Sequence, residues 1–374
     1  MSGTTKMSQL VRQARLGTLI VLVLVAVACT AGCESNAPDD PGGGDTNGVG
    51  DQPAGWMYTE GNRIYLADGA VFHGRGANLH DTRSCWACAW NDPAPEEVMR
   101  RMDTLVDEWG ANFIRLTLEA YGEGSEEQSN WATQYGTVIE DPEYLADIKE
   151  IVDHAATKPG VVVLLSLWTN PSFSELGWPT EATRDQWRLL ARTFADSPHV
   201  MFGLVNEPQY NFDRSLDADV WQAMNDTVQA IREEEDLLGT PHHIITVQGT
   251  GGWARYLDYY IDHPITAYGG ANIAYEVHVY DGQDEFDSRF VTPSQTLPVV
   301  IGEFGPAEGY MTMADCSAMM ELAEQNEVPY LAWTFHMNCP PNLLETTVSG
   351  CGIGAPLRPS EWGQLLIDRL AVLW

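Results

Sequence analysis

From Trp56 onward the chain alternates between short apolar runs and amphipathic stretches. Eight runs are rich in Val, Ile and Leu, as in parallel strands that are buried on both faces; they are Val71–Leu79, Asn112–Leu118, Gly160–Trp168, Val200–Val205, His243–Gly249, Ile273–Tyr280, Pro298–Phe304 and Pro329–Phe335. Between them, apolar residues recur at helical spacing in Pro95–Trp109, Pro142–Thr157, Arg184–Ala195, Ala218–Glu234, Met313–Asn326 and Glu361–Leu373. The connection after the sixth run is only weakly helical.

This alternation predicts an α/β fold, a (β/α)8 TIM barrel, because eight strand and helix units in a chain of this length close such a barrel. A doubly wound open sheet is the rival architecture. It usually carries a Gly-rich phosphate loop after its first strand, whereas Gly74-Arg-Gly76 lies inside the first run and lacks the third Gly. The segment Met57–Gly69 predicts a small β-hairpin that caps the bottom of the barrel.

The amino-terminal residues 1–33 have the features of an export signal. A basic start precedes the mostly apolar run Leu16–Ala28, which is too short for a comfortable membrane span and fits a signal-peptide core. Small residues stand before Cys29 and Cys33, a pattern similar to a bacterial lipoprotein cleavage box, and cleavage there would leave a thiol to be acylated. Ordinary secretion with an incidental Cys is the alternative.

Residues 34–55 are rich in Gly, Pro and Asp, which predicts a disordered acidic tether ahead of a folded domain over residues 56–374. The whole chain has 20 basic and 53 acidic side chains and a formal charge of −33. That balance argues against a nucleic-acid partner, because phosphate backbones are bound by clustered Lys and Arg. We expect a monomer outside the cytoplasm that meets a membrane only through a lipid on Cys29 or Cys33.

Seven cysteines in an exported chain predict disulfides. Cys339 and Cys351 flank a short loop and are the first expected pair. A second disulfide is expected among Cys85, Cys88 and Cys316, which leaves one thiol. The Cys85-Trp-Ala-Cys88 segment alternatively fits a redox or metal motif, but no second Cys pair or nearby His cluster supports zinc.

In a (β/α)8 barrel, functional side chains gather at the carboxyl ends of the strands. The expected strand ends combine carboxylates, amides, imidazoles, a phenol and indoles, without a lysine, a serine nucleophile or a metal cage; they are Asn78, His80, Arg115, Trp168, Asn206, Glu207, Gln248, His278, Tyr280, Glu303 and Trp333. Two carboxylates as acid and nucleophile, with flat aromatic faces for pyranose rings, are what glycoside hydrolysis requires.

The residues around two of these carboxylates resemble glycoside hydrolase family 5, the cellulase family of a clan of (β/α)8 retaining hydrolases. The segment Val200–Pro208, VMFGLVNEP, resembles the fourth-strand motif of the family, and Val299–Gly305, VVIGEFG, resembles its seventh-strand nucleophile motif. Further family positions are filled by FHGRGANL at Phe72–Leu79, Arg115 in NFIRL, His278 and Tyr280 in YEVHVY, and Trp333 in LAW. The likeness covers Trp56 to Trp374.

One departure concerns the third strand. In the family this strand usually ends in a His that helps hold the sugar next to the cleaved bond, whereas here it ends in Trp168. His80 on a neighbouring strand end would supply an imidazole instead, or would have a simple structural role. The departure motivates a second hypothesis, a non-catalytic carbohydrate-binding surface lipoprotein on a degenerate barrel.

The resemblance implies that Glu207 is the general acid/base and Glu303 the nucleophile of a retaining, endo-acting enzyme without metal or organic cofactor. Its substrate would be a β-1,4-linked polysaccharide such as cellulose, mannan or a related glucan. Glu207 must then hold its proton near neutral pH and Glu303 must stay ionised, a state that a neighbouring Arg115 and the Tyr280 hydroxyl would favour by charge and hydrogen bonding.

The same resemblance gives roles to the neighbours of the two carboxylates. Asn206 would hydrogen-bond the sugar 2-hydroxyl, His278 would orient the acid/base region, and Trp333 would lie beneath the ring. Asn206 and Glu207 are adjacent, so both reach the site only if the strand ends or bulges there. Five loop tryptophans would line a glycan cleft or simply pack, and two further acids are expected to be structural or peripheral; these residues are Trp86, Trp90, Trp131, Trp178, Trp253, Glu119 and Glu276.

Overall fold

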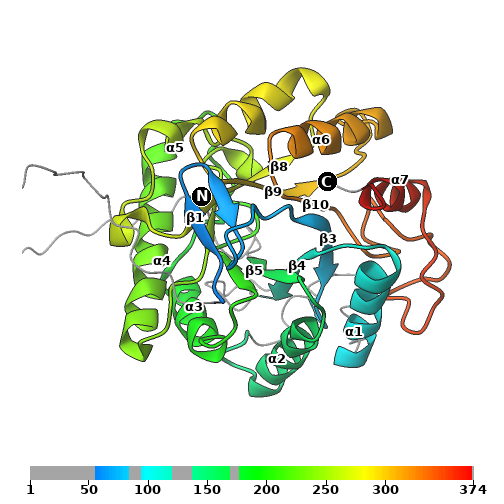
Figure 1. Cartoon of the computed structure of the whole chain (residues 1–374), viewed down its shortest axis with the longest axis horizontal. Helices are drawn as coiled ribbons and strands as arrows, with labels where there is room; N and C mark the ends of the chain where they lie inside the picture. Colours follow the sequence, from blue (N-terminus) through cyan, green and yellow to red (C-terminus); the bar gives the residue numbers. More distant parts are fainter. Residues whose placement is uncertain (1–54, 84–93, 120–136, 169–176, 373–374) are drawn as a thin grey trace, which may run out of the picture. The chain divides into compact units, whose positions relative to one another are not determined.

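The computed structural model describes residues 55–83, 94–119, 137–168 and 177–372. Within them eight parallel strands close into a barrel that helices surround (Figure 1). In order around the barrel the strands are β3 (Arg75–His80), β4 (Phe113–Glu119), β5 (Val162–Trp168), β6 (Val200–Gly203), β7 (Ile245–Gln248), β8 (Ile273–Val279), β9 (Val299–Phe304) and β10 (Tyr330–Ala332), and β10 pairs with β3 to complete the ring. Each predicted run overlaps one strand, so the (β/α)8 barrel is confirmed.

The predicted helices are also present, with ends that differ by a few residues; they are α1 (Pro95–Asp103, continued by a π-helical turn over Thr104–Glu108), α2 (Pro142–Ala156), α3 (Glu181–Thr193), α4 (Asp217–Leu238), α6 (Met313–Gln325) and α7 (Glu361–Leu370). Local chemistry sets their ends. Asp141 caps α2 by accepting from the amides of Glu143 and Tyr144, and Gly239 ends α4 with a φ of 67°.

Two barrel connections have little regular helix. After β7 the chain forms short 3-10 turns and the five-residue helix α5 (Asp258–Asp262). After β8, where the sequence is weakly helical, there are only short helical turns, Gln283–Glu285, Asp287–Val291 and Pro293–Gln295. The remaining helices cover the barrel with a core that includes the outward-facing side chains of every strand.

The predicted amino-terminal hairpin is β1 (Tyr58–Glu60) paired antiparallel with β2 (Arg63–Tyr65). It lies at the amino-terminal ends of the barrel strands, because the Thr59 amide donates to Asn272 Oδ1 just before β8. A separate apolar cluster fills the barrel at that end; it comprises Met57, Ile64, Phe72, Phe113, Val162, Leu164, Met201, Ile244, Ala274, Val300 and Leu331. The barrel is therefore closed at the bottom by packed side chains.

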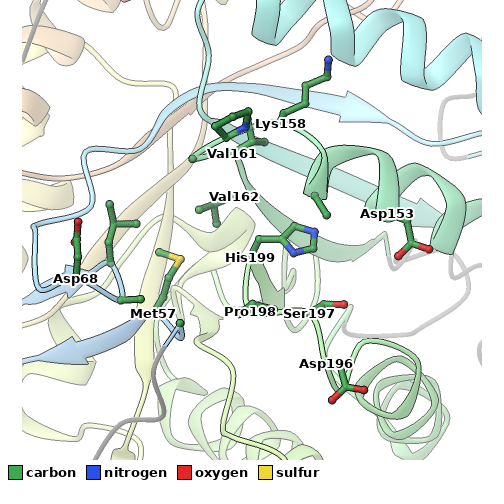
Figure 2. Close-up of a pocket in the computed structure, with 16 residues that line it drawn as sticks. Met57, Asp68, Asp153, Lys158, Val161, Val162, Asp196, Ser197, Pro198 and His199 are labelled. Atoms are coloured by element: carbon green, nitrogen blue, oxygen red, sulfur yellow. The ribbon is translucent and has the colours of Figure 1, made fainter.

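A pocket of about 640 Å³ lies at this same end of the barrel, as Figure 2 shows. The hairpin side contributes Met57 and Asp68, and the segments that lead into β5 and β6 contribute Val161 and His199 among others. None of the predicted site residues lines it. This pocket is therefore separate from the predicted site, which lies at the opposite ends of the strands.

One predicted disulfide is wrong. Cys351 is disulfide-bonded, but among the described residues no disulfide joins it to Cys339, which is a buried thiol, as is Cys316. Cys85 and Cys88 lie outside the described residues. The short loop between Cys339 and Cys351 suggested their pairing from sequence proximity alone, whereas disulfide geometry depends on how the Cβ atoms face each other.

The predicted signal and almost all of the tether, residues 1–54, lie outside the described residues. In the part of the chain that the structure describes, no helix has the length and apolar character needed to cross a membrane.

Candidate active site

Strand β8 supplies a column of polar side chains inside the barrel. Because side chains alternate along a strand, Ala274, Glu276 and His278 face inward, and Tyr280 follows just beyond the strand end. The bottom of this column is apolar, since Ala274 belongs to the cluster that fills the barrel. The polar part therefore begins at Glu276 and leads towards the carboxyl ends of the strands.

A bulge between β8 and β9 brings His278 level with Glu303. The register runs from Val277 opposite Ile301 directly to His278 opposite Glu303, so that Gly302 is the extra residue. A Cβ atom at Gly302 would lie 2.2 Å from Glu276 Oε1. The bulge therefore needs a glycine, and it directs the Glu303 side chain towards His278.

This close approach leads to a prediction on stability. Gly302→Ala should lower the free energy of unfolding by about 2 kcal/mol or more, because the methyl group meets a buried carboxylate that cannot move to solvent. Denaturant unfolding measures the loss. Gly282→Ala is the matched control, since that φ is −70° and the only nearby atom is the flexible Asp284 carboxylate; equal stability of the two variants would contradict the prediction.

Asn206 and Glu207 reach the site because β6 ends early. The strand stops at Gly203, the Leu204 amide still donates to Thr246 O of β7, and beyond Leu204 no strand pairing imposes alternation. Asn206 is buried, while about a quarter of the Glu207 side chain is exposed. The expectation that the strand ends before Asn206 and Glu207 is met.

Arg115 connects most of the site residues. It is fully buried and rises from β4, and its Nη1 donates to Asn78 Oδ1 at 2.9 Å and to Glu303 Oε1 at 3.0 Å. Its Nη2 donates to Asn206 Oδ1 at 2.9 Å and to Ser166 Oγ at 3.0 Å. Tyr280 donates its hydroxyl to the other oxygen of Glu303 at 3.0 Å. Both oxygens of Glu303 therefore accept from fixed donors.

The imidazole of His278 lies between acidic groups. Its Nδ1 is 2.8 Å from Glu207 Oε1 and 3.6 Å from Glu303 Oε2. Burial lowers the pKa of His278, but Glu303, Glu207 and Glu276 more than reverse this and raise it to about 9. The ring is therefore an imidazolium at neutral pH, with both nitrogens donating.

Glu207 and Glu303 face each other closely. One carboxylate oxygen of each and one ring nitrogen of His278 all lie within 4.8 Å of one another. Among the described residues this is the one group of three acidic or imidazole side chains spaced closely enough for a metal ion. The same spacing also suits chemistry between the two carboxyl groups.

The predicted contacts of Glu303 with Arg115 and Tyr280 are present, and both lower the pKa of Glu303, as expected. His278 lowers it as well. Burial, reinforced by the charge of Glu207, outweighs these effects and raises the pKa of Glu303 to about 7. The two donors therefore act in the predicted direction, but desolvation is the larger effect in the free protein.

His80, Trp168 and Trp333 form an aromatic cluster at the ends of β3, β5 and β10. His80 lies edge-on to Trp333 with ring centroids 5.2 Å apart, and Trp168 lies 5.6 Å from Trp333. Burial, together with Arg101 and Arg115, lowers the pKa of His80 to about 3. His80 is therefore neutral and packs beneath the tryptophans, while Trp168 is the more exposed member.

The loop tryptophans have different outcomes. Trp86, Trp90 and Trp131 lie outside the described residues. Trp178 is half-buried and donates to Gln209 O, whereas Trp253 is exposed and lies edge-on to exposed Phe212 at 5.1 Å. Because the Trp253 amide donates to Pro208 O, this aromatic pair is tied to the segment that carries Glu207.

Glu276 was expected to be structural or peripheral. It is not peripheral, because it is fully buried and contacts both Arg115 and His278. The signal was present in the strand pattern, because Glu276 stands two positions before His278 and so shares its inward face. The side chain of Glu119, the other acid in that expectation, lies outside the described part of the structure.

Comparison with known proteins agrees with this geometry. The model of the family described as cellulase, glycosyl hydrolase family 5, matches residues 66–338. The chain belongs to glycosyl hydrolase family 5. The resemblance inferred from the motifs is thereby confirmed at the level of family and enzyme class.

The individual proteins that are similar to this chain share little sequence identity with it. Endoglucanase MaCel5A of Microbulbifer sp. strain ALW1 is 23% identical over 296 residues, which are 75% of this chain and 51% of that protein, so the chain spans about half the length of this relative. A β-glucanase of Saccharophagus degradans, solved with cellotetraose, matches with a TM-score of 0.62 at 20% identity over 84% of this chain and 92% of its own. A β-mannanase of Streptomyces thermolilacinus matches with a TM-score of 0.60 at 22% identity over 83% and 93%. At these identities the two solved structures establish the fold.

Proposed function

We propose that the protein is a retaining, endo-acting glycoside hydrolase that cleaves a β-1,4-linked polysaccharide by double displacement. The observation that carries the proposal is the approach of Glu207 and Glu303 to within 4.8 Å. Retaining enzymes place their two carboxyl groups about 5–5.5 Å apart, whereas inverting enzymes leave roughly 6.5–9.5 Å for a water molecule. The spacing therefore favours direct attack by one carboxylate on the sugar.

In the first step Glu303 forms a bond to the anomeric carbon, the glycosidic bond breaks, and Glu207 gives its proton to the leaving oxygen. Glu303 is the better nucleophile because Arg115 and Tyr280 hold its two oxygens in place. Glu207 is the more exposed of the two and so suits contact with a departing sugar and then with water. In the second step Glu207 takes a proton from water, which attacks the same carbon and restores the original configuration.

The surrounding groups have matching tasks. The oxygen of the Asn206 amide accepts from Arg115, which leaves its nitrogen to donate to the sugar 2-hydroxyl, a contact that strengthens in the transition state. Trp333 and Trp168 offer aromatic surface for the pyranose ring. The exposed pair Phe212 and Trp253 lies beside the segment of Glu207 and suits a sugar on the leaving-group side, as expected for a cleft that binds a chain internally.

The substrate class is tested by release of reducing sugars from a panel of cellulose, mixed-linkage glucan and mannan. Glucan and mannan remain the candidates, because they differ mainly in the orientation of one hydroxyl group and the similar proteins include both a β-glucanase and a β-mannanase. Hydrolysis with a rapid fall in viscosity supports endo action. Retention of a glycan without any hydrolysis would instead support the non-catalytic carbohydrate-binding protein.

We also propose that the domain is displayed outside the cytoplasm on an acylated cysteine, Cys29 or Cys33. Mass spectrometry of the mature protein from its native host should find an amino-terminal Cys that carries more than one acyl chain, because a single chain gives only weak attachment. Cys29→Ala and Cys33→Ala form a matched pair that identifies the modified position. An unmodified amino terminus downstream of Cys33 would rule out the anchor.

A further inference from the structure

Glu276 is a third carboxylate inside the barrel, and the proposed mechanism does not use it. It is fully buried. Its Oε2 accepts from Thr246 Oγ1 at 2.6 Å and Gln248 Nε2 at 2.9 Å, and its Oε1 lies 2.9 Å from Arg115 Nε and 3.2 Å from His278 Nε2. These four partners come from three strands, and the backbones of Gly203 and Gly302 pack closely against the Glu276 side chain. It is thus held away from any sugar.

The charges of the site explain why a fixed anion is useful there. The first chemical step converts Glu303 from a carboxylate into a neutral ester and Glu207 from an acid into a carboxylate. One negative charge therefore moves across the site, while the cations Arg115 and His278 stay. His278 lies beside both ends of this movement, 2.8 Å from Glu207 and 3.6 Å from Glu303. Arg115 is paired with Glu303 and with Glu276.

Arg115 is the residue most affected by the change. Once Glu303 is esterified, Glu276 is the one carboxylate in the described part of the chain that still pairs with Arg115. A fully buried guanidinium without a counter-ion is strongly destabilised. If Arg115 turned towards another counter-ion, it would release Asn206 and the ester oxygen. Both must be held in place at that point for attack by water.

We propose that Glu276 is a positioning residue that acts as the fixed counter-ion of the site and keeps Arg115 in place and His278 protonated while negative charge moves from Glu303 to Glu207. This inference rests on the proposed double displacement for its purpose. The arrangement of the four partners around Glu276 does not depend on that assignment.

The ionisation of both groups fits this role. Burial opposes charge on Glu276, but Arg115, His278 and Thr246 together lower its pKa to about 2. Its charge therefore stays constant through the working pH range. The groups that face His278 are Glu207, Glu276, Glu303 and, through Glu276, Arg115. Two of these three carboxylates change charge during turnover, and Glu276 does not.

The test reads the ring of His278 directly, by nitrogen-15 NMR of histidine-labelled protein, with His278→Asn to assign the signal. In the wild type we expect both ring nitrogens to be protonated up to about pH 9. In Glu276→Gln, which keeps the shape but removes the charge, the pKa of the ring should be lower than in the wild type, because one of the three carboxylates that raise it is lost. The alkaline limb of kcat/KM should move to lower pH with it, and kcat at pH 8 should fall about tenfold or more.

The chain offers a matched control. Glu235 is also fully buried, and it pairs with Arg232 at 2.6 Å and His243 at 2.7 Å, in a cluster that contains none of the site residues. Glu235→Gln should cost stability in the same way but leave the His278 signal and the pH profile unchanged. A similar shift of the pH profile in both variants would assign the effect to general loosening of the fold and overturn the proposal.

A second variant keeps the proposal testable if Glu276→Gln does not fold. Glu303→Gln imitates the neutral ester, and with Glu276 intact His278 should still carry both protons at pH 7. A neutral ring in that variant, or an unchanged ring in folded Glu276→Gln, would overturn the role of Glu276. Neither NMR measurement needs turnover. A wild type that hydrolyses none of the glycans of the panel would therefore overturn the proposed function separately.

Discussion

Glu303→Ala should lose activity by roughly five powers of ten, because it removes both the nucleophile and the anion that stabilises the oxocarbenium-like transition state. The carboxylate is held by Arg115 on one oxygen and Tyr280 on the other, and no other acid described in the structure occupies that position. Steady-state rates on an activated aryl glycoside measure the loss. Glu308→Ala, an exposed acid on the loop after β9, should retain full activity.

Addition of azide to Glu303→Ala should restore turnover of the activated glycoside, since a small anion can enter the space that the side chain leaves. The product should be the glycosyl azide of inverted configuration, because a single displacement inverts the carbon. In the wild type, proton NMR should show the first-formed sugar with retained configuration. An inverted first product from the wild type would make Glu303 a base that acts through water and would contradict the double displacement.

The fold could be predicted from the sequence because its signal is repeated. Each of the eight apolar runs overlaps one strand, and the order of strand and helix leaves few topologies. The ends of the elements were less predictable. The run at Val200–Val205 continues past the last paired residue, Gly203, since apolar side chains remain buried after the strand ladder ends. This early end is also what frees Asn206 and Glu207 from alternation.

The site could be predicted where a single residue at a strand end has one role. The contacts of Arg115, His278 and Tyr280 with the two carboxylates are those that the motifs implied. The place of Glu276 and the cysteine pairing could not be predicted in the same way, because each depends on which side chains meet in three dimensions. The register shift at Gly302 likewise depends on a local contact between two strands, and no spacing in the sequence predicts it.

The direction in which Arg115 and Tyr280 act on Glu303 could be predicted, but a count of neighbouring donors leaves out desolvation. Arg115 and Tyr280 are both in place, yet burial dominates and raises the pKa of Glu303 to about 7. Such a group is close to the midpoint of its titration in the free protein.

Glu207→Gln should separate substrates by their leaving groups. For a polysaccharide, whose leaving oxygen needs a proton, the glycosylation step should slow by about 10²–10⁴-fold. For a dinitrophenyl glycoside, whose leaving group departs as a stable anion, the same step should remain close to the wild-type rate. Hydrolysis of the intermediate lacks its base in either case, so the activated substrate should give a burst of phenolate followed by slow turnover.

Rapid-mixing measurement of that burst isolates the step in which the acid acts. The Gln side chain keeps the size of Glu207 and can still accept from His278 Nδ1, so a change in structure is not the expected cause of the loss. In Glu207→Ala, azide should attack the glycosylated Glu303 and give the azide of retained configuration, opposite to the product from Glu303→Ala. Equal slowing of the burst for both kinds of substrate would remove Glu207 from the acid/base role, because loss of a proton donor cannot affect a leaving group that needs no proton.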